Sequence, residues 1–251
     1  MLKQIWYLYI REVKSMVRQP IWIVMSLTMP LMFLAFYAPL LMTMGGLDLT
    51  IAEVFDDFVP RILTMIAFSA GLSGGYDMVI DLRTGVIERF RVTSARRSSM
   101  LLAKVMYSIT AFLVPAMILL LIALPFGFSM NFGGLVILIL LLSMLTAVFA
   151  AFASAIALKV KEMGSVAAVS SGIQMPMMLL SGMFLRITSA APTWLYTLAH
   201  FNPLFYTVEA SRYLAEGAFT NNYVFYAFGI VTLLAVLTMW WATRVYRSAV
   251  K

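Results

Sequence analysis

The sequence predicts an all-α polytopic membrane protein, and three observations support this fold class. Of its 251 residues, 63% are hydrophobic and 12% are charged, and the mean hydropathy is +0.94. Soluble domains are about 45–50% apolar and about 25% charged. The apolar residues form six blocks, each long enough to cross a hydrocarbon core of about 30 Å as a helix. Basic residues fall mainly in alternate gaps between these blocks. We therefore expect one transmembrane domain covering residues 1–251.

The six predicted spans cover residues 21–44, 62–80, 104–126, 133–158, 164–184 and 223–246. Of the 18 Lys and Arg residues, 15 lie before the first span or around the ends of the second, fourth and sixth. Cytoplasmic loops of membrane proteins carry such an excess of basic residues. This pattern predicts a multi-pass protein of the plasma (inner) membrane with both termini in the cytoplasm.

Residues 1–19 precede the first span and predict an amphipathic helix in the membrane interface. On a helical wheel, one face is apolar and includes Ile5, Trp6 and Tyr9, whereas Arg11 and Lys14 lie on the other. Such a helix lies in the headgroup plane, with its basic face toward anionic lipid or a cytoplasmic partner. The alternative is a simple topological anchor.

Residues 81–103 form a basic cytoplasmic segment that is longer than a simple connection requires. In a short helix, Val86, Ile87 and Phe90 would face the membrane. The polar residues that would then project into the cytosol are Glu88, Arg89 and Arg91. This pattern favours a docking helix for a cytoplasmic partner, and the alternative is a stop signal that only sets topology.

Residues 185–217 lie between the fifth and sixth spans and predict an outer re-entrant hairpin of two short helices. Pro192 and Pro203 suit first helical positions, Asn202 suits an N-cap and Gly217 suits a helix stop. The segment is also rich in aromatic residues, which favour the membrane interface.

The hairpin contains a candidate outer gate. Its side chains either pair with one another for structural reasons or contact a substrate. Glu209, Arg212 and Glu216 have the spacing of neighbours on one helical face. We expect Arg212 to be held by one of these two carboxylates. The aromatic side chains expected to narrow a route are Phe201, Phe205 and Tyr206.

Small residues recur every four positions in the second and fourth spans. They include Gly71, Gly75 and Ala151, and this spacing lets helix backbones approach closely. We interpret them as packing positions between helices, with a dimer seam or a sliding surface as alternatives.

Several kinds of chemistry are not expected in this chain. It contains no cysteine and one histidine, His200, which argues against thiolate or histidine metal sites. The GLSGG sequence at residues 71–75 lacks the Gly-Lys-Ser/Thr ending of a phosphate loop. No predicted span carries a charged residue near its middle, which disfavours an ion-coupled transporter. We expect no cofactor, no enzymatic activity of its own and no nucleic-acid partner.

Two stretches resemble permeases of the type-2 ABC exporter family. Gly85, Glu88, Arg89 and Thr93 match the Gly-x-x-Glu-Arg-x-x-x-Thr pattern of that family's coupling helix, although Ser94 replaces the common Pro. Residues 175–217 are similar to the signature near the fifth span. The matching elements are Pro176, Ser181–Phe184, Pro192–Leu195, Asn202–Pro203 and Arg212, with Arg186 where Pro is frequent.

The resemblance implies a permease that pairs with a second copy of itself, or with a closely related permease, and binds two cytoplasmic ABC ATPase subunits. Those subunits would bind ATP and Mg, and the permease would contact them through its coupling segment. The residues implied are Arg83, Gly85, Glu88, Arg89, Arg91 and Thr93. The implied substrate is amphipathic, either a drug or a lipid-linked glycan, with drug efflux as the narrower expectation. The alternative is a membrane-embedded scaffold or assembly protein that transports nothing.

Overall fold

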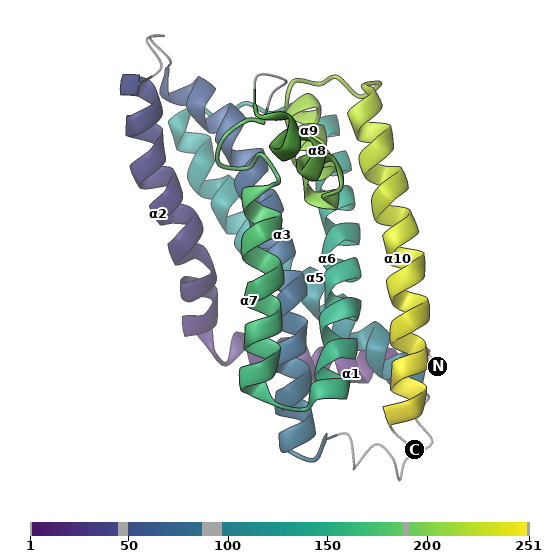
Figure 1. Cartoon of the computed structure of the whole chain (residues 1–251). Coiled ribbons are helices and arrows are strands. Elements are labelled where there is room, and N and C mark those ends of the chain that lie inside the picture. Colours follow the sequence, from purple (N-terminus) through teal and green to yellow (C-terminus); the bar gives the residue numbers. More distant parts are fainter. Residues whose placement is uncertain (1, 45–49, 87–96, 188–190, 250–251) are drawn as a thin grey trace.

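The computed structural model describes residues 2–44, 50–86, 97–187 and 191–249 (Figure 1). These parts of the chain contain nine α-helices, one 3₁₀ helix and no strand. The all-α prediction is therefore confirmed for them. The elements are α1 (Leu2–Val17), α2 (Pro20–Met44), α3 (Ile51–Arg83), α5 (Arg97–Ala123), η1 (Leu124–Phe126), α6 (Phe132–Val160), α7 (Met163–Leu179), α8 (Thr193–His200), α9 (Pro203–Ala215) and α10 (Asn222–Ala249).

Four helical stretches are long and apolar enough to cross a membrane: α3, α5 with η1, α6 and α10. Helices α1 and α2 meet at a bend of 72° and make a fifth span if this bent pair is counted as one. Helix α7 has 17 residues. Length and composition thus identify four or five spans within the described chain.

Helix α3 begins well before the predicted span at residue 62. Thr50 and Glu53 form a reciprocal cap: the Thr50 N–H donates to Glu53 Oε2 at 2.8 Å, and the Glu53 N–H donates to Thr50 Oγ1 at 3.4 Å. This capping box starts the helix about three turns earlier. Asp57 and Arg61, which fall between the first two predicted spans, therefore lie on α3.

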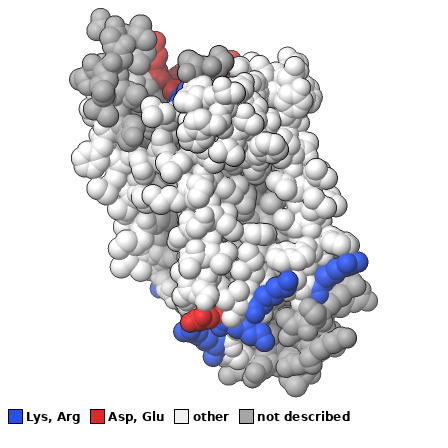
Figure 2. Space-filling model, viewed as in Figure 1, with Lys and Arg blue, Asp and Glu red and all other residues white. Residues whose placement is uncertain are grey.

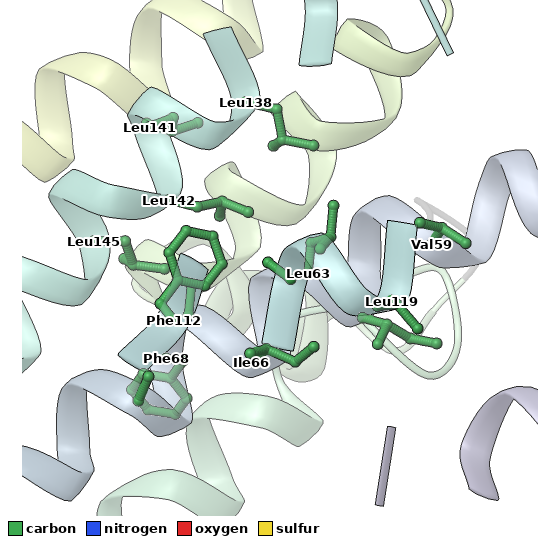
Figure 3. Close-up of a cluster of buried hydrophobic side chains, with 14 of the residues drawn as sticks. Val59, Leu63, Ile66, Phe68, Phe112, Leu119, Leu138, Leu141, Leu142 and Leu145 are labelled. Atoms are coloured by element: carbon green, nitrogen blue, oxygen red, sulfur yellow. The ribbon is translucent and has the colours of Figure 1, made fainter. Parts of the chain in front are cut away.

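The core lies between α3, α5 and α6. Figure 3 shows its aliphatic and aromatic side chains meeting at the centre of the bundle. Most of α3 is buried. The labelled core residues are Val59, Leu63, Ile66, Phe68, Phe112, Leu119, Leu138, Leu141, Leu142 and Leu145.

The small residues of α3 lie against α6 of the same chain. A Cβ atom added to Gly71 would lie 2.7 Å from Phe149 Cβ, and one added to Gly75 would lie 3.2 Å from the Ala153 carbonyl oxygen. Ala151 is fully buried. Thr146 Oγ1 on α6 also donates to the Ala67 carbonyl at 3.0 Å. This arrangement corresponds to packing within one chain rather than to a dimer seam.

Different helices lie at the two ends of the bundle (Figure 1). Helix α1 lies crosswise at one end, where α10 also finishes. Helices α8 and α9 lie at the opposite end. Helix α10 packs on α6 and α9, whereas α2 lies to one side against α3 and α5.

Candidate functional site

A cavity of about 550 Å³ lies between α2, α3 and α7. Its wall is mainly apolar and rich in methionine. The apolar lining residues are Trp22, Met25, Met29, Pro30, Phe33, Met65, Ile66, Ala70, Ala111, Met175, Met178, Leu179 and Phe184. Methionine side chains are flexible and polarizable, so they adapt to ligands of different shape.

Five polar residues interrupt this apolar wall: Ser26, Ser69, Ser73, Ser171 and Gln174. Gln174 Nε2 on α7 donates to Ser69 Oγ on α3 at 2.9 Å. Ser26 and Ser73 donate to carbonyls of their own helices, each at 2.8 Å. None of the described lining residues is charged. The cavity therefore suits a largely apolar ligand that has one or a few hydrogen-bonding groups.

A buried cluster of charges lies beside the hairpin, at the α8–α9 end of the bundle. Arg61, Glu209 and Arg212 are only 6%, 5% and 6% exposed. Arg212 Nη1 lies 3.3 Å from Glu209 Oε1, and Arg212 Nη2 donates to the Gly182 carbonyl at 3.1 Å. Arg61 pairs with Asp57 on its own helix. Asp57 Oδ1 also lies 3.9 Å from Arg212 Nε. These contacts join α3, α9 and the segment after α7 in what we call the outer charge cluster.

Arg212 is the centre of this cluster. Burial lowers the pKa of its guanidinium, and the carboxylate of Glu209 opposes this change. Arg186 Nη2 approaches the same carboxylate at 3.7 Å. Within the described chain Glu216 is exposed and forms no ion pair, so the partner of Arg212 on α9 is Glu209.

The expected caps of the hairpin are present, with one shift. Asn202 caps α9 by accepting the Leu204 N–H at 3.0 Å. Its Nδ2 also donates to the Met177 carbonyl at 2.6 Å, which ties α9 to α7. Pro203 occupies the first turn of α9, and Gly217 has φ +78° after the helix ends. Pro192 is the N-cap of α8 rather than its first residue.

The three aromatic residues expected at a gate occupy different environments. Phe201 is 83% exposed, whereas Phe205 is 2% exposed and its ring lies 4.7 Å from that of His200. Tyr206 is half-buried, 6.4 Å from the Tyr226 ring on α10. None of the three lines the cavity between α2, α3 and α7. The rotation of α9 turns Phe205 and Tyr206 toward α8 and α10 instead.

A second charge cluster lies at the other end of the bundle and joins α1, α3 and α5. Lys104 is buried, and its Nζ lies 2.6 Å from Asp81 Oδ2 and 3.2 Å from Glu12 Oε1. Arg11 pairs with Glu12 at 2.5 Å and with Asp81 at 3.4 Å. Lys104 also donates to the Asp77 carbonyl at 3.4 Å. We call this the inner charge cluster.

The inner charge cluster lies next to the predicted coupling segment. Arg83 is exposed at the last position of α3. Gly85 has φ +68°, a left-handed conformation that favours glycine. The other expected coupling residues, Glu88, Arg89, Arg91 and Thr93, lie outside the described residues.

Sequence reasoning missed the cavity and the partners of Lys104. Gln174 was a detectable signal, because an amide inside an apolar span needs a partner. Asp77 and Asp81, one helical turn apart, also indicated a polar face on α3. The sequence has no comparable signal for Glu12 as the partner of Lys104, since these residues lie far apart in the chain.

The family of this chain is indicated by a comparison with known proteins. The model of the family described as ABC-2 type transporter matches residues 3–215, which extend from α1 to the end of α9. No curated protein matches the chain significantly. Because the family match covers most of the chain, including α2, α3 and α7 around the cavity, this membrane protein belongs to the ABC-2 type transporter family, whose members are membrane components of transport systems.

Proposed function

We propose that this chain is the transmembrane subunit of an ATP-driven exporter. It moves an amphipathic substrate from the cytoplasm or inner leaflet through the cavity between α2, α3 and α7. The observation that carries this proposal is the cavity itself, because its volume and its apolar lining with few polar groups are typical of small-molecule sites.

The proposal includes six spans, formed by α2, α3, α5, α6, α7 and α10. The start of α1 and the end of α10 lie at the same end of the bundle, as an even number of crossings requires (Figure 1). The 17 residues of α7 are at the lower limit of about 17 for a spanning helix.

Charge supports the orientation of these spans. Figure 2 shows Lys and Arg side chains at the end of the molecule where α6 and α10 finish, below a wide band without charges. The excess of basic residues marks the cytoplasmic side. We place this end in the cytoplasm and the α8–α9 hairpin outside, in the plasma (inner) membrane.

The energy for transport comes, on this proposal, from two cytoplasmic ABC ATPase subunits that bind ATP and Mg. The permease contacts them through residues 81–103. The inner charge cluster supports this role because it fixes α1, α3 and α5 beside that segment. A second copy of the permease completes the transporter and encloses the cavity.

The substrate proposed is a drug-like molecule rather than a glycan. A sugar chain has many hydroxyl groups, and each would lose hydrogen bonds with water on entering this wall. Five polar side chains suffice for a molecule that is largely apolar. This makes drug efflux the narrower proposal.

The test is transport by the reconstituted complex. The chain is co-purified with an ABC ATPase from the same organism and placed in liposomes, and ATP-dependent uptake of fluorescent amphipathic drugs is measured. We expect Gln174→Leu to raise the KM for transport about three- to tenfold, as the loss of one hydrogen bond predicts.

Ser143→Ala is the matched control. Its removal likewise deletes one side-chain hydrogen bond, from Ser143 Oγ to the Ile139 carbonyl, but Ser143 lies outside the cavity wall, so transport is expected to be unchanged. A complex that assembles but moves none of the drugs or lipid-linked glycans would contradict the export proposal and favour the scaffold alternative.

A further inference from the structure

The ends of α6 and α10 carry cations that have no acidic partner among the described residues. Lys159 and Lys161 lie at the end of α6, and Arg244 lies in the last turns of α10. None of the three forms an ion pair with any residue that the structure describes. They contrast with Lys104 and Arg212, which are held by carboxylates in the inner and outer charge clusters.

Adjacent tryptophans hold two of these cations in place. Lys159 Nζ lies 5.2 Å from the centre of the Trp241 ring, and Arg244 Cζ lies 3.8 Å from the centre of the Trp240 ring. The Trp241 ring is also 5.8 Å from Phe152 on α6. These cation–π contacts order the side chains while leaving the positive charges available to an anion. We call Lys159, Trp240, Trp241 and Arg244 the α6–α10 basic surface.

The basic surface continues into an apolar stripe on α10. Leu233, Leu237, Trp240 and Arg244 follow one another at spacings of four, three and four residues, so they share one helical face. Leu233, Leu237 and Trp240 are 60%, 52% and 55% exposed. The face changes from aliphatic to aromatic to cationic along the helix. A phospholipid has the same order, from acyl chains through the interface to the phosphate.

The carboxylate closest in sequence does not cancel the positive charge. Glu162, the N-cap of α7, accepts a hydrogen bond from Ser165 Oγ at 2.6 Å and forms no ion pair with described residues. The three cations therefore exceed this single anion. Arginine and lysine both bind phosphate oxygens through charge-assisted hydrogen bonds.

We propose that the α6–α10 basic surface binds the headgroup of an anionic phospholipid, with the acyl chains along Leu233 and Leu237. A lipid fits better than a soluble phosphate compound because the cations lie next to an exposed apolar face, which acyl chains could cover and a soluble phosphate compound could not. That face belongs to a helix long and apolar enough to span the membrane. This interaction is separate from the proposed transport, since none of these residues lines the cavity.

The experiment compares lipid retention by the purified full-length chain. The protein is titrated with phosphatidylglycerol or phosphatidylcholine, and bound lipid is counted by native mass spectrometry. We expect a clear preference for phosphatidylglycerol. Each basic residue near an anionic lipid adds about fivefold to binding, so Lys159→Gln/Arg244→Gln is expected to reduce the preference roughly twenty- to thirtyfold.

A matched single variant separates the site from general charge. Arg244→Gln alone is expected to lower the preference about fivefold, whereas Arg186→Gln, which removes one exposed charge near the α8–α9 end of the bundle, is expected to keep it. The charge-preserving Lys159→Arg/Arg244→Lys is also expected to keep the preference. Equal loss in Arg244→Gln and Arg186→Gln, or equal binding of the two lipids, would overturn the proposal. Displacement of the lipid by millimolar inorganic phosphate would show a free-anion site and also overturn it.

A measurement on the unaltered protein keeps the test decisive if a variant misfolds. Phosphatidylglycerol with brominated acyl chains is expected to quench tryptophan fluorescence more than brominated phosphatidylcholine does. Trp240→Phe is expected to reduce that difference. Equal quenching by both lipids in the unaltered protein would reject the proposed site.

Discussion

The most unusual residues of this apolar bundle are the charged side chains that lie buried near the α8–α9 hairpin. Arg61, Glu209 and Arg212 are almost fully removed from water, although each carries a charge. Breaking a buried ion pair leaves an uncompensated charge, which costs more than the intact pair contributes. Each of the three is paired, Arg212 with Glu209 and Arg61 with Asp57, so no charge in this group is left uncompensated.

Arg212→Ala is expected to destabilise the protein by about 3 kcal/mol or more, because Glu209 would lose its closest cation. Arg186→Ala is the control. It removes a longer contact to the same carboxylate from a side chain that is 58% exposed, and it is expected to cost about 1 kcal/mol or less. Thermal unfolding of both variants in detergent checks this. Equal stability of the two variants would show that burial does not decide the effect.

At the scale of helices, close backbone approach between α3 and α6 builds the core. Gly71 and Gly75 lie where a side chain would collide with α6. Thr146 and Ser154 add hydrogen bonds from α6 to the α3 carbonyls of Ala67 and Gly74, at 3.0 and 3.3 Å. Small residues and such bonds are the usual basis of helix association in membranes.

Gly71→Ala is expected to destabilise the bundle by about 1–3 kcal/mol, because its Cβ would lie 2.7 Å from Phe149 Cβ. Gly172→Ala on α7 is the matched control, since nothing lies within 4 Å of its added Cβ. Alanine is the better helix former, so this change is expected to be neutral or stabilising by up to about 1 kcal/mol. Chemical or thermal unfolding in detergent measures both. A Gly71→Ala variant as stable as Gly172→Ala would argue against the close contact between α3 and α6.

The inner charge cluster attaches α1 to the bundle through Lys104. Lys104→Met is expected to loosen α1, because Glu12 and Asp81 would lose their buried cation and keep only the more exposed Arg11. Hydrogen exchange of the α1 backbone amides measures this, and faster exchange is expected. Lys104→Arg retains the charge and is expected to preserve protection. Unchanged exchange in Lys104→Met would show that the other α1 contacts, among them the Arg11–Asp81 pair, hold α1 without Lys104.

For the whole molecule, topology is the property to test. The natural chain has no cysteine, so single cysteines can be labelled without background. Glu162→Cys, before α7, is expected to react with an impermeant maleimide only after the membrane is permeabilised. Thr197→Cys on α8 is expected to react from outside. Both positions are exposed in the structure, and reaction of both from one side would show that α7 does not cross.

Local signals in the sequence sufficed for the helical membrane class and for the family. The bilayer sets the length of each apolar block and the side on which basic residues lie, and it does so for each segment separately. The cap of α9 was equally predictable, because Asn202 and Pro203 act on the next turn of their own helix. Each of these features depends on neighbours within a few positions along the chain.

The tertiary structure alone decided which side chains meet. The rotation of α9 buried Phe205 away from the cavity, and the docking of α1 brought Glu12 to Lys104, 92 positions further along the sequence. Gln174 was visibly unusual, but only the placement of α7 beside α3 gave it Ser69 as a partner. Such contacts depend on how helices distant in sequence rotate and pack against one another. Hydropathy and spacing describe each helix by itself, so they do not contain this information.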